Sequence, residues 1–177
     1  MRVVAGKYRG KKLKEFSLNS TRPTLDRVKE AIFSSIQFDV LNTKTLDLFS
    51  GTGALGIEAI SRGAKTTFLV DASKDAVKII KENLKNIVED CKVINSDYLS
   101  FLNNVKTQKF DVVLLDPPYA TDYAEKAIDF ILSNDMLSDN GVIVWEKAID
   151  TKLPEYENLF VKTKKYGTVE VVYIRKH

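Results

Sequence analysis

The residues with the clearest chemical potential form the turn Asp116-Pro117-Pro118-Tyr119, which follows the apolar run Phe110–Leu115. The run predicts a buried strand, and two prolines cannot continue it because they lack the N–H that the ladder needs. The Asp116 carboxylate and the Pro117 carbonyl can only accept hydrogen bonds, and the Tyr119 ring can stack on a flat ring. A planar group with an exocyclic NH2 fits such a turn. The alternative is a strand-ending turn with an incidental tyrosine.

A glycine turn forms the second candidate site. Residues 47–56 (DLFSGTGALG) contain G-x-G-x-x-G between a predicted strand and a predicted helix. Glycines permit a tight turn and a close approach of the backbone to a ligand. Asp71 ends the next predicted strand, twenty positions after Gly51, where a carboxylate can bind both ribose hydroxyls of a nucleoside. The alternative is a packed strand-to-helix turn with an aspartate that caps a helix.

The residues around this turn also bear on the class of cofactor. A dinucleotide needs helix N–H groups for its pyrophosphate, whereas S-adenosylmethionine has no phosphate and carries a cationic amino group. Asp47, just before the turn, suits the cation. Asp97, after the third strand, can reach an adenine amino group or equally cap the following helix. The candidate cofactor-binding residues are Asp47, Phe49, Ser50, Gly51, Gly53, Gly56, Asp71, Ala72, Ser96 and Asp97.

The elements that must position these residues alternate along the chain. The predicted strands are 45–49, 66–71, 92–95, 110–115 and 141–146, and the predicted helices are 24–38, 54–62, 73–87, 97–104 and 122–133. This alternation predicts a doubly wound, mostly parallel, Rossmann-like α/β sheet, whose strands end at the usual ligand-binding edge. The strand-like segments 159–164 and 168–175 predict an antiparallel pair at one side. Residues 2–14 predict a hairpin or extended arm.

Length and composition limit the class of protein and the number of domains. A length of 177 residues with 44% hydrophobic and 29% charged residues is typical of one globular domain. We expect a small basic arm, residues 1–20, followed by a catalytic domain, residues 21–177. No apolar run has membrane-spanning length. The single cysteine, Cys91, excludes a disulfide framework, argues against a Cys-rich zinc site and favours a reducing cytoplasmic setting. The single histidine, His177, is terminal, which argues against histidine acid–base chemistry.

Charge is unevenly distributed along the chain. The net charge is only +3, yet residues 1–14 include six basic residues and no acidic one. This arm predicts phosphate contacts, and the alternative is a solvated hairpin edge protected by charge. Arg22 and Arg27 flank the start of the first predicted helix, where they can pair with Asp26 and Glu30. The candidate substrate-binding residues are Arg2, Lys7, Arg9, Lys11, Lys12, Arg22 and Arg27.

These motifs together resemble a known family. The turn Asp116–Tyr119 is similar to the Asp/Asn-Pro-Pro-aromatic signature of class I S-adenosylmethionine-dependent methyltransferases that modify exocyclic amines. An N-terminal signature of the RsmD family resembles residues 2–6 (RVVAG), 9–13 (RGKKL) and 21–33 (TRPTLDRVKEAIF). That family consists of bacterial methyltransferases of guanine N2 in 16S ribosomal RNA. The resemblance runs from residue 2 to the C-terminus and departs at Tyr119, where many members have phenylalanine.

The resemblance implies an rRNA (guanine-N2-)-methyltransferase with S-adenosylmethionine as cofactor. It also implies that the segment with Arg22 and Arg27 lies over the cofactor or substrate. Its implied partner is ribosomal RNA, within a small-subunit assembly particle, and it implies no metal and no membrane. The candidate catalytic residues are Asp116, Pro117, Pro118 and Tyr119. The acceptors at Asp116 and Pro117 would hold the amine hydrogens, the ring of Tyr119 would stack on the base, and Asp116 or water would take the proton.

Three other functions compete with this one. An adenine-N6 methyltransferase acting on DNA or RNA can share the Asp-Pro-Pro-Tyr turn, although no segment is left over for a separate target-recognition domain. For a nicotinamide-dependent oxidoreductase, Asp47 and the turn Asp116–Tyr119 are unfavourable. A non-catalytic RNA-binding module would not need the intact turn.

Overall fold

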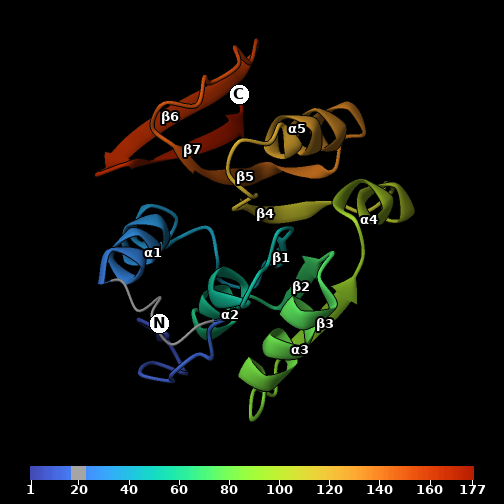
Figure 1. Ribbon diagram of the computed structural model, residues 1–177. Coiled ribbons are helices and arrows are strands. Elements are labelled where there is room, and N and C mark those ends of the chain that lie inside the picture. Colours follow the sequence, from blue (N-terminus) through green and yellow to red (C-terminus); the bar gives the residue numbers. More distant parts are fainter. Residues whose placement is uncertain (17–22) are drawn as a thin grey trace.

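Seven strands form one sheet in the order β3-β2-β1-β4-β5-β7-β6 in a computed structural model that describes residues 1–16 and 23–177 (Figure 1). The strands are β1 (Lys44–Asp47), β2 (Thr66–Asp71), β3 (Asp90–Asn95), β4 (Phe110–Leu115), β5 (Leu137–Ala148), β6 (Leu159–Tyr166) and β7 (Val169–Lys176). The pairs β1–β2, β2–β3, β1–β4 and β4–β5 are parallel, and β5–β7 and β6–β7 are antiparallel. The predicted fold class and its antiparallel C-terminal pair are therefore confirmed.

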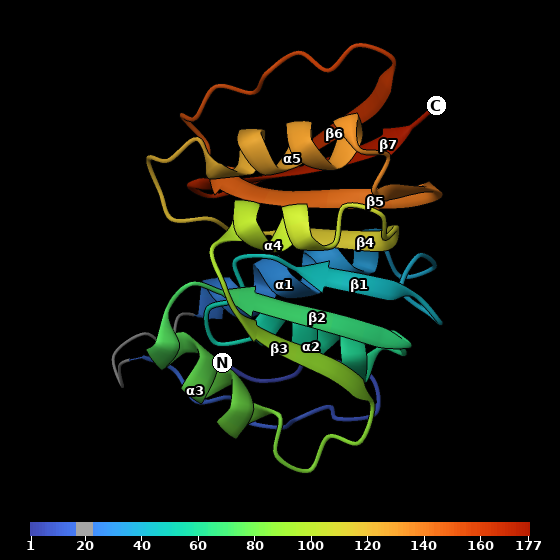
Figure 2. The ribbon, with the colours of Figure 1, turned by 90° about the vertical axis from the view of Figure 1, so that its right-hand side faces the viewer.

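Five helices in the described part of the chain cover both faces of the sheet. They are α1 (Pro23–Ser35), α2 (Ala54–Ser61), α3 (Lys74–Asn83), α4 (Tyr98–Asn104) and α5 (Tyr123–Ser133). In Figure 2, α4 and α5 lie in front of the strands and α1 lies behind them. The side chains of β4 alternate to match, because Val113 and Leu115 pack with α4 and α5, whereas Val112 and Leu114 pack with α1. None of the described helices has the length and apolar character to cross a bilayer.

The N-terminal residues form a short hairpin against α2 and α3. Arg2 and Lys12 make an isolated antiparallel bridge, and Val3 and Leu13 are buried in a cluster with side chains of α2 and α3. At Gly6 the chain passes so close to α2 that a Cβ would lie 1.9 Å from the Ser61 carbonyl oxygen. Only glycine fits such an approach, so this contact fixes the hairpin on α2.

Two predicted helix ends were wrong. The helix predicted over 73–87 ends at Asn83, whose side-chain amide donates to the carbonyls of Lys14 (3.0 Å) and Thr52 (2.9 Å), and Asn86 then has a positive φ of 66°. The helix predicted over 24–38 ends at Ser35 and continues as a turn. Periodicity extended both helices too far because apolar residues beyond each end still pack against the same clusters, as Ile36 does.

Candidate active site

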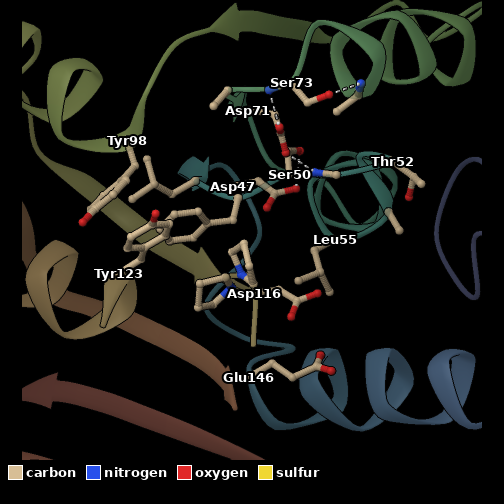
Figure 3. Close-up of a pocket in the computed structure, with 18 of the residues that line it drawn as sticks. Asp47, Ser50, Thr52, Leu55, Asp71, Ser73, Tyr98, Asp116, Tyr123 and Glu146 are labelled. Atoms are coloured by element: carbon tan, nitrogen blue, oxygen red, sulfur yellow. Dashed lines mark hydrogen bonds between the residues drawn. The ribbon is translucent and has the colours of Figure 1, made fainter. Parts of the chain in front are cut away.

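A pocket of about 550 Å³ lies where β1, β2, β4 and β5 end, at the carboxyl edge of the sheet (Figure 3). This is the edge at which open α/β sheets bind ligands. Its lining combines the two motifs that the sequence singled out, the glycine turn after β1 and the Asp-Pro-Pro-Tyr turn after β4. The topology thus brings together segments more than sixty residues apart in the chain.

The glycine turn is held by the carboxylate of Asp47 at the end of β1. Its Oδ2 accepts hydrogen bonds from the Ser50 hydroxyl (2.7 Å) and the Gly56 backbone N–H (2.9 Å). Gly51 and Gly53 have φ values of 57° and 83°, which favour glycine. A Cβ at Gly56 would lie 2.8 Å from Leu69 Cδ2 and 2.9 Å from Asp47 Oδ2, so the helix start packs directly on the strand ends.

The carboxylate of Asp71 ties the glycine turn to the end of β2. It accepts from the backbone N–H of Gly51 (2.8 Å) through Oδ2 and from that of Ser73 (2.8 Å) through Oδ1. The residue is half-buried and lines the pocket. Each carboxylate oxygen has a further lone pair, so Asp71 can brace the turn and still accept from hydroxyl groups of a ligand.

The residues after β3 lie on the neighbouring wall. Asp97 caps α4 by accepting from the Ser100 N–H (3.1 Å), which satisfies the capping interpretation, and it also lines the pocket together with Ser96. Asn95, which sequence reasoning missed, donates to the carbonyls of Asp71 (3.0 Å) and Ala72 (2.9 Å). This amide links the ends of β2 and β3, and no local motif marks it.

An aromatic cluster closes one side of the pocket. The ring of Phe49 lies 5.2 Å from that of Tyr98 and 6.3 Å from that of Tyr123, with the second pair stacked at 16°. Phe49 was a sequence candidate, whereas Tyr98 and Tyr123 were not. Both tyrosines are the first residue of a helix that follows a strand-end turn, and this position was the signal that could have identified them.

The Asp116 turn places acceptors and a ring at the mouth of the same pocket. Asp116 is exposed to the pocket, and no described residue donates a hydrogen bond to it. Tyr119 is 69% exposed, and the Thr121 hydroxyl braces the turn by donating to the Pro118 carbonyl (2.8 Å). Desolvation by the surrounding protein raises the pKa of Asp116, with a further increase from the charge of Glu146. Desolvation is the larger of these two causes.

Asp47 provides the test of whether a cationic ligand fits. Its side chain is 1% exposed, and its Oδ1 is buried with no hydrogen-bond partner among the described residues. Burial raises the pKa of Asp47 to about 7, against the hydrogen bonds from Ser50 and Gly56 that lower it, and the charges of Asp116 and Asp71 raise it further. A cationic group in this pocket would relieve three neighbouring carboxylates, so the site fits the amino end of S-adenosylmethionine.

The predicted substrate-binding residues lie apart from the pocket. Arg22 is outside the described residues, and none of Arg2, Lys7, Arg9, Lys11, Lys12 and Arg27 lines the pocket. Lys7 pairs with Glu89 (2.6 Å) and Lys11 donates to the Lys85 carbonyl (2.8 Å), whereas the side chains of the exposed Arg9 and Lys12 have no such contact with a described residue. Among the α1 side chains that the structure describes, Lys29 lines the pocket; it is buried against Glu58 (3.3 Å) and was not predicted.

Comparison with known proteins identifies relatives along nearly the whole chain. The family model described as Conserved hypothetical protein 95 matches residues 1–175. Ribosomal RNA small subunit methyltransferase D of Haemophilus influenzae is 38% identical over 174 residues, covering 96% of this chain and 90% of its own. The protein of the same description from Escherichia coli is 32% identical over 155 residues, covering 87% and 78%. The solved structure of yhhF from Escherichia coli has a TM-score of 0.86 at 31% identity, covering 99% and 98%.

Proposed function

The chain belongs to the family described as Conserved hypothetical protein 95, the RsmD family, and from this premise we propose that it transfers a methyl group from S-adenosylmethionine to the exocyclic N2 amine of a guanine in 16S ribosomal RNA. The observation that carries the proposal is the position of an acceptor-only turn, Asp116-Pro117, in the same pocket as the glycine turn. A cofactor and an amine held at these two turns would meet inside one cavity.

The cofactor half of the pocket suits the three parts of S-adenosylmethionine. Asp71 offers acceptors to the ribose hydroxyls, and Asp47 offers negative charge to the amino group. Ser96 and Asp97 lie on the wall where an adenine amino group would find acceptors. When bound, the cofactor supplies a sulfonium-activated methyl group, which is electrophilic at carbon.

The other half of the pocket prepares the amine. An exocyclic amine of a base is a poor nucleophile because its lone pair is delocalised into the ring. Acceptors at the Asp116 carboxylate and the Pro117 carbonyl hold the two hydrogens and turn the lone pair out of the base plane. Tyr119 stacks on the base and fixes that plane. Positioning of this kind can account for much of the rate enhancement of a displacement, and Asp116 or water then accepts the proton.

Ribosomal RNA as the substrate is supported by the relatives, since those from Haemophilus influenzae and Escherichia coli are both described as ribosomal RNA small subunit methyltransferases. The target base must be unpaired or flipped to enter a pocket of about 550 Å³. Two of the exposed cations of the N-terminal hairpin, Arg9 and Lys12, provide phosphate contacts outside the pocket. We propose that the protein binds this RNA within a small-subunit assembly particle.

A labelling experiment tests this function. The protein is incubated with methyl-labelled S-adenosylmethionine and with small-subunit particles, or their naked RNA, from a strain that lacks it. The RNA is then digested to nucleosides, which mass spectrometry identifies. We expect label in N2-methylguanosine at one mapped position, and none in particles from the parent strain, where that position is already methylated. Label in N6-methyladenosine would instead establish the adenine alternative, and unlabelled RNA would refute both.

A further inference from the structure

A second carboxylate, that of Glu146, faces the pocket beside Asp116. Leu115 pairs in register with Trp145 across β4 and β5, so the next residue on each strand is Asp116 and Glu146. Both residues line the pocket, and in Figure 3 both side chains project toward the same side of it. Adjacent parallel strands therefore deliver two acids side by side at the position where the base is expected.

Glu146 has no evident structural partner. Among the described residues, no hydrogen-bond donor and no cation reaches its carboxylate, whereas Glu170 on the adjoining strand β7 pairs with Lys147 at 2.6 Å. Lys147 also donates to the carbonyl of Thr151 (2.6 Å), so the one cation next to Glu146 in the chain is engaged elsewhere. Burial raises the pKa of Glu146, as it does that of Asp116. An acid in this position needs donors from a ligand.

The donor pattern of the bases indicates which ligand supplies them. Guanine presents N1–H and the N2 amine side by side, so that three hydrogens lie along one edge. Adenine and cytosine place a ring-nitrogen acceptor beside their amine, and uracil has a single N–H between two carbonyls. Hydrogen-bond donors from a ligand favour the ionised form that burial disfavours, and in that form the two carboxylates accept hydrogen bonds but cannot donate them. Guanine alone among the four bases therefore satisfies both acids at once.

We propose that Glu146 selects guanine by accepting the N1–H, while Asp116 and the Pro117 carbonyl accept from the N2 amine. The inference rests on the proposed function, because it presumes that the methylated amine is N2 of guanine. It assigns the choice of base to β5 rather than to the Asp-Pro-Pro-Tyr turn. That turn recognises an amine, and Glu146 recognises the ring nitrogen next to it.

The base 2,6-diaminopurine isolates this contact, because it keeps the 2-amino group but has an unprotonated N1. RNA carrying either guanine or 2,6-diaminopurine at the mapped position can be made by splinted ligation. Single-turnover rates of N2 methylation are then measured with saturating RNA and cofactor. With the wild-type protein we expect the diaminopurine rate to be at least tenfold lower. Equal rates on the two RNAs would overturn the proposal without recourse to any variant.

Glu146→Gln provides the complementary test, since an amide can donate to the bare N1. Compared with the wild-type protein, we expect the rate of Glu146→Gln on guanine RNA to fall at least tenfold. We also expect the ratio of its guanine rate to its diaminopurine rate to fall at least tenfold. The affinity for S-adenosylhomocysteine should stay unchanged. Glu157→Gln, an exposed residue after β5, is the matched control for the charge change and should behave as wild type. A ratio in Glu146→Gln within twofold of wild type would overturn the inference while leaving guanine methylation intact. Methylation of adenine by the wild-type protein would overturn both proposals.

Discussion

The backbone N–H of Gly51 donates a 2.8 Å hydrogen bond to Oδ2 of Asp71, so the glycine turn after β1 is fastened to the end of β2 before any ligand binds. The second oxygen of Asp71 holds the N–H of Ser73 at the start of α3. One carboxylate therefore sets the distance between the two segments that must enclose a nucleoside. Preorganisation of this kind reduces the ordering that binding would otherwise require.

Removing this carboxylate should weaken cofactor binding. For Asp71→Ala we expect a loss of affinity for S-adenosylhomocysteine on the order of 1–3 kcal/mol, because ribose hydroxyls and two backbone N–H groups lose acceptors. Asp71→Asn keeps one acceptor and should lose less. Isothermal titration calorimetry measures both, with circular dichroism to confirm folding. If a folded Asp71→Ala binds with wild-type affinity, Asp71 does not contact the cofactor.

Two glycines of the turn should respond differently to alanine. A Cβ at Gly56 would clash with Leu69 and Asp47, so Gly56→Ala should cost about 1–3 kcal/mol of unfolding free energy. A Cβ at Gly51 meets no protein atom within 4 Å and sits in the pocket wall. Gly51→Ala should cost only about 1–2 kcal/mol through its positive φ and chiefly weaken S-adenosylhomocysteine binding.

Urea unfolding and calorimetry on both variants separate stability from binding. We expect Gly56→Ala to lose more unfolding free energy than Gly51→Ala. We expect Gly51→Ala to lose more affinity for S-adenosylhomocysteine than its own loss of stability would explain. The reverse pattern would mean that the open space at Gly51 is not the space that the cofactor occupies.

Much of this site was predictable from sequence because its signals are local. A strand followed by Gly51-x-Gly53, or by two prolines after Asp116, identifies a strand end within a few residues. The parallel topology then requires these ends to meet at one edge, as they do. The order of elements was predictable for the same reason, since helical and strand periods alternate plainly along the chain.

Glu146 and Lys29 were not predictable, because each depends on a pairing between distant segments. Glu146 faces the pocket only through the register of β5 on β4, which shifts between Phe110 and Val112 because β5 advances from Leu137 to Val142 over the same step. A slip of one residue would have turned Lys147 into the pocket instead. Lys29 is buried because Glu58 of α2 lies opposite it, and nothing near Lys29 in the sequence reveals that partner.

The buried Asp47 predicts a pH dependence of stability. Its pKa is raised from 3.8 to about 7, chiefly by burial. Between these two pH values the folded state therefore keeps a proton on Asp47 that the unfolded state has lost. This contribution to stability is fully present below about pH 4 and is lost as pH rises through about 7. Relative to Asp47→Asn, the wild-type protein should be less stable at about pH 8 than at about pH 5.

Urea unfolding of both proteins at the two pH values provides the check on Asp47. We expect the stability difference between them to change by on the order of 1 kcal/mol or more. A difference that stays constant across this range would show that Asp47 is ionised throughout, with its Oδ1 satisfied by water rather than desolvated.

Arg9 and Lys12, exposed hairpin cations whose side chains make no hydrogen bond or ion pair with a described residue, should contribute to RNA affinity but not to cofactor affinity. Neutralising Arg9 and Lys12 as Arg9→Gln/Lys12→Gln should weaken binding of small-subunit RNA and reduce its salt slope by roughly one for each phosphate that is no longer neutralised. Lys7→Gln/Lys11→Gln is the comparison, because these two side chains already engage Glu89 and the Lys85 carbonyl and should matter less. If Arg9→Gln/Lys12→Gln matches the wild-type protein in RNA affinity and in salt slope, the hairpin is a purely structural element.

The most direct test of the central claim is the single-turnover rate of methyl transfer in Asp116→Ala, with RNA and S-adenosylmethionine both saturating. No described residue donates a hydrogen bond to Asp116, so its removal should preserve the fold and the affinity for S-adenosylhomocysteine. We predict a fall of at least about 100-fold, with Asp116→Asn intermediate because its amide keeps a carbonyl acceptor. A rate for Asp116→Ala within a few-fold of wild type, under roughly 1 kcal/mol of barrier, would contradict the account and remove the Asp-Pro-Pro-Tyr turn from the mechanism.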